Sequence, residues 1–405
     1  MNNKGKQVRL LSILFCLFMT AMNANGQTFQ ADSLESKMDS VDICLLTCGP
    51  GNEVYSLYGH TAIRVHDRIN NTDLAINYGM FSFEQENFVL RFIFGLTDYE
   101  IGITSFERFK QEYTYEGRWI KEQVLNLSAK DKLQIISAIE NNYRPENRVY
   151  RYNYFYDNCT TRARDILLDN MSEKVIMPSG SEDDITYRDI IHQWTSNHPW
   201  TRFGNDLLLG VKADVNTTAE EQQFIPLNLL YDFSKAQVYG ADNTHKPLVE
   251  SEQWIVKPTP QTLEESFPIS PKTTFLILFI ITVILTVLES RLHVSFWLYD
   301  FLLLLLTGLS GLVLFAMVFS QHPTVSLNLQ ILILNPLNLV FLYPVTRKLM
   351  KGQIHYYVYV YTLLLILSFF GTLVQQYAEG IYILALSLLL RMLSIIYNYK
   401  KKESR

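Results

Sequence analysis

The sequence has no excess of positive charge. Its 35 Lys and Arg residues are outnumbered by 40 Asp and Glu residues, which gives a net charge of −5. Proteins that bind nucleic acid usually carry a concentrated basic surface, so we expect no nucleic-acid partner. Charged residues make up only 19% of the chain and hydrophobic residues 48%, which is too apolar for an ordinary soluble enzyme of 405 residues.

Cysteine is also scarce, and its spacing argues against a disulfide or a metal site. Cys44 and Cys48 lie in the apolar stretch "DICLLTCGPG". On a strand their side chains share a face about 13 Å apart, whereas a disulfide needs Cα atoms within about 7 Å. No pair of His or Cys stands nearby to complete a zinc site, and His192 and His198 have no metal-ligand spacing. We therefore expect Cys44 and Cys48 to be buried small residues, Cys159 to be an unpaired thiol, and no metal or cofactor.

Long apolar runs are what the sequence has instead. The first begins after Lys4, Lys6 and Arg9 and ends in the small and polar residues "NANGQ". This order predicts a signal peptide over residues 1–26, because the apolar run is short for a membrane span. A retained first transmembrane helix is the alternative.

Five apolar segments follow in the C-terminal part, each near the length needed to cross about 30 Å of hydrocarbon. We therefore predict an extracytoplasmic domain over residues 27–270, five transmembrane helices over residues 271–399 and a cytoplasmic tail over residues 400–405. Basic residues fall only in the short loops predicted to be cytoplasmic, which is the positive-inside pattern. The segments are residues 274–289, 296–319, 327–345, 355–376 and 380–397.

Polar residues interrupt these spans in three places. Arg391 and Asp300 either snorkel to the membrane surface or pair within the bundle. The stretch "HPTVSLNLQILILNPLNL" puts His322 and Asn328 at the outer face, beside the extracytoplasmic domain. A broken helix there forms either a notch for lipid entry or a proline kink whose polar groups are satisfied by neighbours.

The extracytoplasmic domain carries one candidate nucleophile. In "NCTTRARDILLDN" Cys159 stands at the first turn of a predicted helix, where the helix dipole and a nearby imidazolium would lower its pKa. His60 opens the predicted strand "HTAIRVHD", which pairs antiparallel with the strand "LAINYGMF". A third polar group then orients the imidazole: Asn77 is the first choice, with Asp73 and His66 behind it. A buried, inert Cys159 is the alternative.

Two motifs add a family resemblance. "YGHTAIRV", followed about a hundred residues later by "YNYFYDNCTTRARDIL", resembles the circularly permuted papain-like hydrolases and acyltransferases that include lecithin:retinol acyltransferase. The resemblance implies an α+β, circularly permuted papain-like domain ahead of the all-α bundle of five transmembrane helices. It also implies Cys159 as nucleophile, His60 as base and Asn77 as the third catalytic residue, although many relatives have His at that third place.

The whole chain is similar to the Lnb-type lipoprotein N-acyltransferases of Bacteroidetes envelopes. "LYGHTAIRV", "NYFYDNCTTRARD", "HPTVSLNLQILILNPLN" and residues 207–230 stand where that family has them. The resemblance implies a multi-pass protein of the bacterial inner membrane with a periplasmic catalytic domain. Its partners would be the bilayer, a phospholipid acyl donor and a lipoprotein acceptor. The acyl chain would pass through a Cys159 thioester to the N-terminal amine of a diacylglyceryl-cysteine.

Other roles and other functions remain open at this point. The backbone N–H of Cys159 is a candidate for the oxyanion hole. Arg162 and Arg164 either contact a lipid phosphate or form a solvated helix face, and Tyr58 either lines the pocket or packs in the core. The alternative functions are a phospholipase or thioesterase that uses water, a cell-wall amidase, and a non-catalytic anchor or sensor. The candidate substrate-binding residues are Tyr58, Asn158, Arg162, Arg164, His322 and Asn328.

Overall fold

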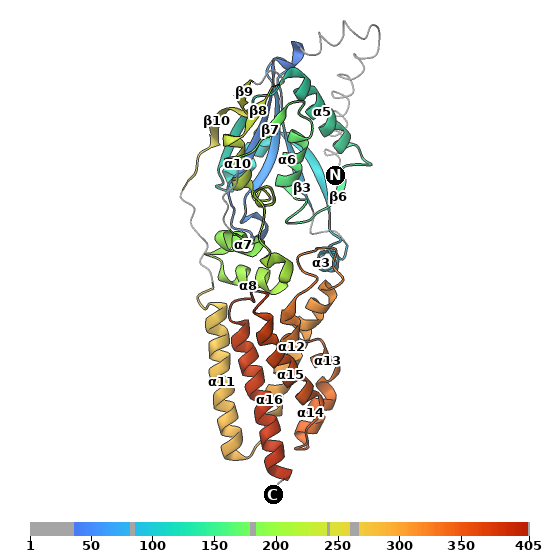
Figure 1. Cartoon of the computed structure of the whole chain (residues 1–405), viewed down its shortest axis with the longest axis vertical. Helices are drawn as coiled ribbons and strands as arrows, with labels where there is room; N and C mark the ends of the chain where they lie inside the picture. The colour runs from blue at the N-terminus through green and yellow to red at the C-terminus, as the bar shows by residue number, and fades with distance from the viewer. Residues whose placement is uncertain (1–35, 82–85, 179–183, 241–243, 260–266, 404–405) are drawn as a thin grey trace.

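The computed structural model describes residues 36–81, 86–178, 184–240, 244–259 and 267–403, and the predicted signal peptide lies outside these ranges. A seven-stranded sheet occupies one end of the molecule and a helical bundle the other (Figure 1). Neighbouring strands of the sheet are all antiparallel, in the order β10-β5-β1-β2-β3-β4-β6. The strands are β1 (Val41–Cys48), β2 (His60–Asp67), β3 (Thr72–Met80), β4 (Asp98–Ser105), β5 (Ile120–Leu125), β6 (Val149–Arg151) and β10 (Val249–Val256).

Strands β2 and β3 confirm the predicted antiparallel pair, and their register fixes which side chains share a face. Ala62 lies opposite Asn77, and Cys48 of β1 lies opposite His60. Side chains alternate along each strand, so Ile63 packs on one face of the sheet and Ala62 on the other. The start of β2 therefore brings His60 to the same face and the same end of the sheet as Asn77.

Helices cover both faces of this sheet. Helices α5 (Ala129–Tyr143), α6 (Cys159–Leu168) and α10 (Pro226–Lys235) pack with Ile63 in the larger core, whereas α4 (Phe106–Tyr115) covers the opposite face. Ser128 is the N-cap of α5 and forms a capping box with Asp131. The predicted helix after Asn158 is α6, and Cys159 is its first residue.

A smaller layer lies between the sheet and the bundle (Figure 1). Its apolar core joins Tyr58 and Phe155 of the sheet domain to Tyr187 and Phe224 of the layer and to Met317 of the bundle. A three-stranded sheet in the order β7-β8-β9 packs beside the larger one. The remaining elements outside the bundle are η1 (Val54–Ser56), α3 (Phe88–Ile93), β7 (Lys174–Ile176), α7 (Tyr187–Thr195), α8 (Pro199–Leu208), η2 (Val211–Asp214), α9 (Ala219–Gln222), β8 (Gln237–Tyr239) and β9 (His245–Pro247).

The bundle contains helix in each of the five predicted spans. Helices α11 (Pro271–Leu292), α12 (Trp297–Met317) and α16 (Ile381–Glu403) are long and apolar enough to cross a membrane, and α15 (Tyr357–Gly371) is shorter. Together with the sheet domain they confirm an α+β domain followed by an all-α membrane domain.

The third predicted span, residues 327–345, differs from a continuous helix. A 3-10 turn, η3 (Leu329–Leu332), and α13 (Leu337–Val340) precede α14 (Leu342–Met350), and the chain bends by 73° between them. Pro336 has no N–H to continue a helix, and Asn335 accepts the N–H of Leu337 at 3.0 Å. Tyr361 of α15 donates to the carbonyl of Ile333 at 2.6 Å, so a neighbouring helix satisfies the opened backbone.

The intramembrane charges pair within the bundle. Arg391 of α16 is fully buried and donates two hydrogen bonds of 2.8 Å to Asp300 of α12 and one of 2.9 Å to Glu289 of α11. A buried guanidinium needs such partners, because an unpaired charge in hydrocarbon is costly. The triad therefore ties three helices together.

Candidate active site

The N-terminal turn of α6 fixes the position of Cys159. The side-chain oxygen of Asn158 accepts the N–H groups of Thr160 and Thr161 at 2.8 and 2.9 Å. Its amide nitrogen donates to the carbonyls of Tyr154 and Phe224 at 2.9 and 2.8 Å. Asn158 is thus a helix cap that uses both ends of its amide, and its contact with substrate stays a prediction. The side chain of Asn158 therefore caps the N–H groups of Thr160 and Thr161, and not the N–H of Cys159.

The first residue of β2 faces this turn. His60 Nε2 lies 2.9 Å from Asn77 Oδ1, and because an amide oxygen only accepts, the imidazole donates from Nε2. The other ring nitrogen, Nδ1, is then left for the thiol. The imidazole also stacks on the ring of Tyr113, with centroids 6.5 Å apart and planes at 14°. Two neighbouring groups therefore fix both the tautomer and the ring plane.

The two alternative third residues lie elsewhere. Asp73 accepts two hydrogen bonds of 2.7 Å from Arg64. His66 is opposite Asp73 in the register, at the end of β2 remote from His60. Of the three candidates, the structure brings only Asn77 to the imidazole.

Cys159 and His60 perturb each other. Burial raises the pKa of the Cys159 thiol, but the adjacent His60 imidazole, the backbone N–H of Thr61 and the Thr160 hydroxyl outweigh it and lower the pKa to about 7. Burial lowers the pKa of His60, but Cys159 and then Asn77 raise it, and the net shift is upward. Both shifts favour a thiolate–imidazolium pair near neutral pH.

The other two described thiols are not activated. Cys44 and Cys48 are buried and unpaired, as predicted. Burial is the main cause that raises the pKa of both, in Cys48 to about 12. Cys159 is also the only one of the three that is partly exposed.

Aromatic side chains and one glycine border the thiol. Gly79 lies in β3, two residues after Asn77, and its φ is +85°. A Cβ built on Gly79 would lie 3.6 Å from Cys159 Cβ. It would lie 3.9 Å from both the Tyr150 hydroxyl and Tyr152 Cε2. This backbone conformation favours glycine, and any side chain at position 79 would be strained and would pack directly against Cys159.

Three predicted substrate-binding residues have structural partners. Arg162 makes two hydrogen bonds to Asp157, at 2.6 and 2.8 Å, and lies 3.5 Å above the ring centre of Tyr150. Arg164 pairs with Asp165 at 2.7 Å. Tyr58 is buried, and its hydroxyl accepts a hydrogen bond of 2.8 Å from Asn205. The side chains of Arg162 and Arg164 stay partly exposed, at 25% and 13%, whereas Tyr58 links the loop before His60 to α8.

His322 and Asn328 lie where the bundle meets the periplasmic part, as their positions in the sequence predict. Asn328 donates to the carbonyl of Leu207 at 2.8 Å and accepts from Gln375 at 2.9 Å. His322 is in ring contact with Phe92 of α3, with centroids 6.5 Å apart. Asn328 therefore holds the junction together, while His322 lies beside α3.

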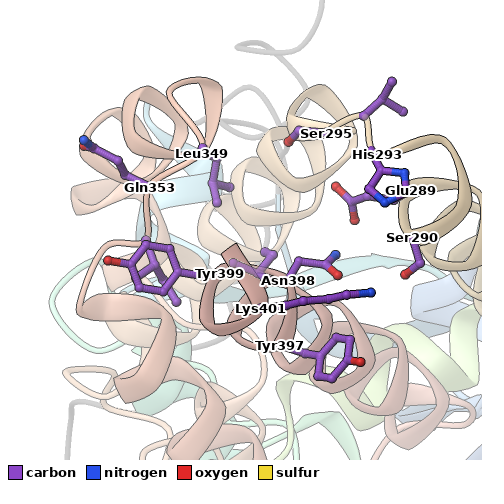
Figure 2. Close-up of a pocket in the computed structure, with 14 residues that line it drawn as sticks. Glu289, Ser290, His293, Ser295, Leu349, Gln353, Tyr397, Asn398, Tyr399 and Lys401 are labelled. Carbon is purple, nitrogen blue, oxygen red and sulfur yellow. The ribbon is translucent and has the colours of Figure 1, made fainter. Parts of the chain in front are cut away.

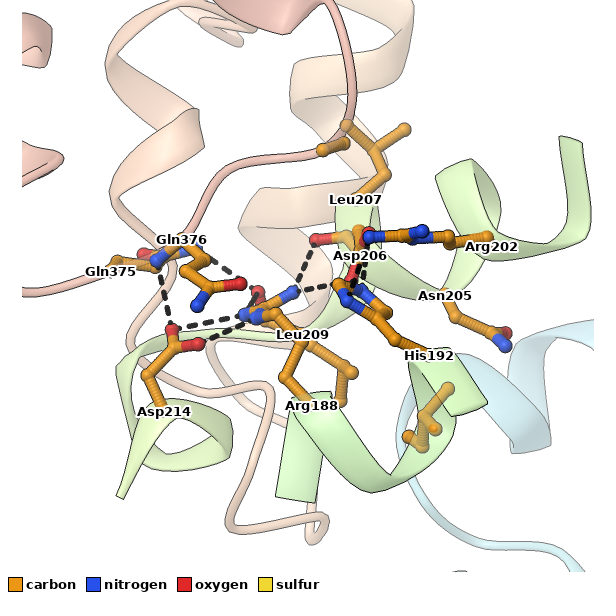
Figure 3. A network of polar contacts seen from close by, with 12 residues as sticks. Arg188, His192, Arg202, Asn205, Asp206, Leu207, Leu209, Asp214, Gln375 and Gln376 are labelled. Carbon is orange, nitrogen blue, oxygen red and sulfur yellow. Dashed lines mark hydrogen bonds and ion pairs between the residues drawn. The ribbon is translucent and has the colours of Figure 1, made fainter. Parts of the chain in front are cut away.

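A buried ion network at this junction was not predicted. Arg188 is fully buried and bonds to Asp206 at 2.9 Å and to Asp214 at 2.6 Å, while His192 bonds to Asp206 at 2.8 Å (Figure 3). The network reaches the bundle, because Asp214 also accepts the backbone N–H of Gln376 at 3.1 Å. No spacing motif marks these residues, since their partners come from separate turns of the chain.

A pocket outside this region lies at the opposite end of the molecule. Glu289, Ser290, His293 and Tyr397 line it, near the C-terminal end of the bundle (Figure 2). It is remote from Cys159 and takes no part in the site described above. No group of three or more His, Cys, Asp or Glu suited to a metal ion occurs among the described residues.

Comparison with known proteins gives two family matches. Residues 29–193 match the model of the Lnb N-terminal periplasmic domain, and residues 262–403 match the model of the Lnb transmembrane domain. The first match includes Cys159, His60 and Asn77, and the second includes all of the bundle helices. No curated protein and no solved structure matches the chain.

Proposed function

Because the chain belongs to the Lnb family, a membrane enzyme type with a periplasmic domain, we propose that it is an acyltransferase of the bacterial inner membrane. In this proposal it moves a fatty acyl chain from a phospholipid, through a thioester on Cys159, to the N-terminal amine of a diacylglyceryl-cysteine lipoprotein. The donor and the acceptor follow from the family resemblance.

One observation carries the proposal: Asn77, His60 and Cys159 come together at the end of the sheet. His60 Nε2 is held by Asn77 Oδ1 at 2.9 Å, and the pKa of Cys159 is lowered to about 7. A thiolate is the reactive form of cysteine, so much of the enzyme would be ready to attack at neutral pH. The same pair is the usual arrangement for covalent catalysis of acyl transfer.

In the first half-reaction the Cys159 thiolate attacks the ester carbonyl carbon of the phospholipid. The C–S bond forms, and the tetrahedral intermediate collapses as the ester C–O bond breaks. His60 gives its proton to the departing oxygen, which leaves as the hydroxyl of a lysophospholipid. The backbone N–H of Cys159, at the positive end of α6, is suited to stabilise the oxyanion.

In the second half-reaction the lipoprotein amine attacks the thioester carbonyl. His60, now neutral, accepts the amine proton as the C–N bond forms. The C–S bond breaks, the Cys159 thiolate leaves, and the imidazolium–thiolate pair is restored. The product is an amide, and no net proton or electron is consumed between the two halves.

The architecture supports membrane-bound substrates for both halves. The catalytic residues belong to a domain tied by hydrogen bonds to the outer ends of the membrane helices, such as that from Asn328 to Leu207. Substrates held in the same bilayer meet a tethered site at a high effective concentration, which favours transfer between two lipids.

The test is a complementation experiment with the full chain. Cells that lack the protein receive wild type, Cys159→Ala or the control Cys44→Ala, which removes a buried thiol from β1 remote from His60. The mass of the N-terminal lipopeptide of one abundant lipoprotein is then measured. We expect a triacylated N-terminus with wild type and Cys44→Ala, and a diacylated N-terminus with a free amine with Cys159→Ala.

Two results would overturn the proposal. If all three strains give the same lipoform at matched protein levels, Cys159 does not carry N-acylation. If the purified protein releases only free fatty acid from phospholipid in the presence of a diacylated lipopeptide, water is the acceptor and the enzyme is a phospholipase.

A further inference from the structure

The short helix α3 exposes apolar side chains in the part of the domain nearest the bundle. Val89 is 68% exposed, Leu90 56% and Phe92 44%. Burying such side chains on folding is ordinarily favourable, so a cluster of exposed ones on one helix indicates an interaction surface. Figure 1 places α3 directly above the outer end of α12.

Contacts with the bundle fix the depth of α3. The N–H of Gln321, four residues after the end of α12, donates to the carbonyl of Phe94 at 3.0 Å. At Gly95 the two segments are so close that a Cβ would lie 3.1 Å from the backbone nitrogen of His322. The outer end of a membrane-spanning helix therefore holds α3 at the level of the bilayer surface.

The exposed surface of α12 continues into that of α3. Phe315, Val318 and Phe319, in the last turn of α12 and just after it, are all exposed. On a membrane-spanning helix such side chains face lipid, and aromatic residues are enriched at the membrane interface. The apolar side chains of α3 thus extend a surface that already contacts the bilayer.

A row of aromatic rings runs from α3 toward the thiol. Phe92 stacks on Phe88 with centroids 6.4 Å apart, and Phe88 stacks on Phe81 at 6.2 Å. Phe81 is 5.0 Å from Tyr99, which in turn stacks on Tyr152 at 4.1 Å. Adjacent rings at these separations form a continuous apolar surface.

The row ends at the candidate nucleophile. Tyr152 and Cys159 lie on either side of the space left by Gly79, since a Cβ there would be 3.9 Å from Tyr152 Cε2 and 3.6 Å from Cys159 Cβ. Both also pack against the same apolar core. The five rings, from Phe92 to Tyr152, therefore form an apolar path from α3 to the thiol. The hydroxyl groups of the two tyrosines are its only polar atoms among these five side chains.

We propose that α3 docks on the periplasmic leaflet of the bilayer, and that the rings from Phe88 to Tyr152 guide the acyl chain of a leaflet phospholipid to Cys159. The occupant of this surface is lipid, because its position is set by α12. The guidance of the chain rests on the proposed function, whereas the docking of α3 does not.

Docking is tested without catalysis. In a chain with Cys16 and Cys159 replaced by alanine, either Val89→Cys or the control Ile69→Cys is labelled with an environment-sensitive fluorophore and reconstituted in phosphatidylcholine–phosphatidylglycerol vesicles. Ile69 is 79% exposed and lies in the turn at the other end of β2. Spin-labelled phospholipids should quench the probe at position 89 about five-fold more than at position 69, because quenching needs contact with lipid.

Guidance of the acyl chain is tested by comparing two donors. Leu90→Glu and Phe81→Ala are expected to lower thioester formation from long-chain phospholipid in vesicles by about ten-fold or more, because each removes apolar contact with the chain or the leaflet. Thioester formation from dibutanoyl-phosphatidylcholine, which dissolves as a monomer, should change by less than about two-fold. Ile69→Glu is the matched control and should leave both rates unchanged.

The outcomes separate the two proposals. Equal quenching at positions 89 and 69 overturns the docking of α3 on lipid. This result does not depend on activity, because the labelled chain lacks Cys159. If a protein added to the vesicles then binds α3, the occupant of the α3 surface is a protein. Equal losses on both donors overturn guidance of the chain and assign Phe81 a structural role. If wild type forms no thioester with either donor, the proposed function itself fails.

Discussion

The hydrogen bond between His60 and Asn77 gives the sharpest prediction. Replacing Asn77 by alanine removes the side-chain oxygen that accepts from Nε2 of His60 at 2.9 Å. The backbone pairing of Asn77 with Ala62 is unaffected, so β2 and β3 should stay in register. The change therefore acts on the imidazole and not on the sheet.

The magnitude follows from the charge on the imidazole. A hydrogen bond to a charged group contributes about 1.5–3 kcal/mol, and each 1.4 kcal/mol is a factor of about ten. The bond is made to the imidazolium of the reactive ion pair, so kcat/KM of Asn77→Ala should fall by about 10- to 150-fold. Asn77→Asp keeps an acceptor at this position and should retain more of the activity.

The pH profile separates this role from a structural one. Asn77 helps to raise the pKa of His60, so its removal lowers that pKa and moves the alkaline limb of kcat/KM to lower pH. When His60 carries less positive charge, it stabilises the Cys159 thiolate less, and the pKa of Cys159 rises. The acidic limb of kcat/KM therefore moves to higher pH. The profile of Asn77→Ala should thus be narrower from both sides.

The assay is transfer of a labelled acyl chain from phospholipid to a diacylated lipopeptide in vesicles, measured from pH 5 to 10. His66→Ala is the control, since its side chain lies at the far end of β2, and it should behave as wild type. The reasoning would be refuted by an Asn77→Ala enzyme with the wild-type profile, or by a comparable loss in His66→Ala.

Three further predictions concern the thiol, its helix and the junction. Alkylation of Cys159 by iodoacetamide should have its midpoint near pH 7. In His60→Ala the midpoint should rise to the ordinary thiol value of about 8.5 or above, because only the weaker effects of the Thr61 N–H and the Thr160 hydroxyl then oppose burial; an unmoved midpoint would contradict the pairing. Asn158→Ala should cost about 2 kcal/mol of unfolding free energy and slow this alkylation, whereas the control Ser128→Ala, at the start of α5, should cost stability alone. Arg188→Met removes the buried guanidinium that Asp206 and Asp214 share, while His192 and the N–H of Gln376 remain as partners, so the free energy of unfolding in detergent should fall by about 3 kcal/mol, the lower end for a broken buried ion pair. A loss below about 1 kcal/mol would show that the network is not needed for stability.

Local signals made much of the site predictable. His60 opens an alternating strand and Cys159 stands at the first turn of a predicted helix, so a few neighbouring residues predict both positions. Choosing Asn77 over Asp73 and His66 depended on register, which the hairpin's side-chain alternation leaves ambiguous by multiples of two. The structure resolves that choice, because Asn77 Oδ1 lies 2.9 Å from His60 Nε2, whereas Asp73 and His66 pair with each other at the other end of β2.

Other features depended on contacts between distant parts of the chain. Arg188 gave no signal, because its carboxylate partners are 18 and 26 residues away on separate turns. The break in the third span was marked by Pro336, but which neighbour would satisfy its backbone could not be read from the sequence.

The junction between the two parts has a consequence for biogenesis. Its hydrogen bonds join the segment from Leu207 to Asp214 to Asn328, Gln375 and Gln376. The ribosome makes the first segment more than a hundred residues before the others, and the last two belong to the final loop to reach the periplasm. The smaller layer between the sheet and the bundle can therefore form all of its hydrogen bonds only after the last two membrane helices, α15 and α16, have been made. A chain arrested before that point would carry Cys159 on a domain that α11 and α12 already tether to the membrane, but its junction would lack the hydrogen bonds from Gln375 and Gln376.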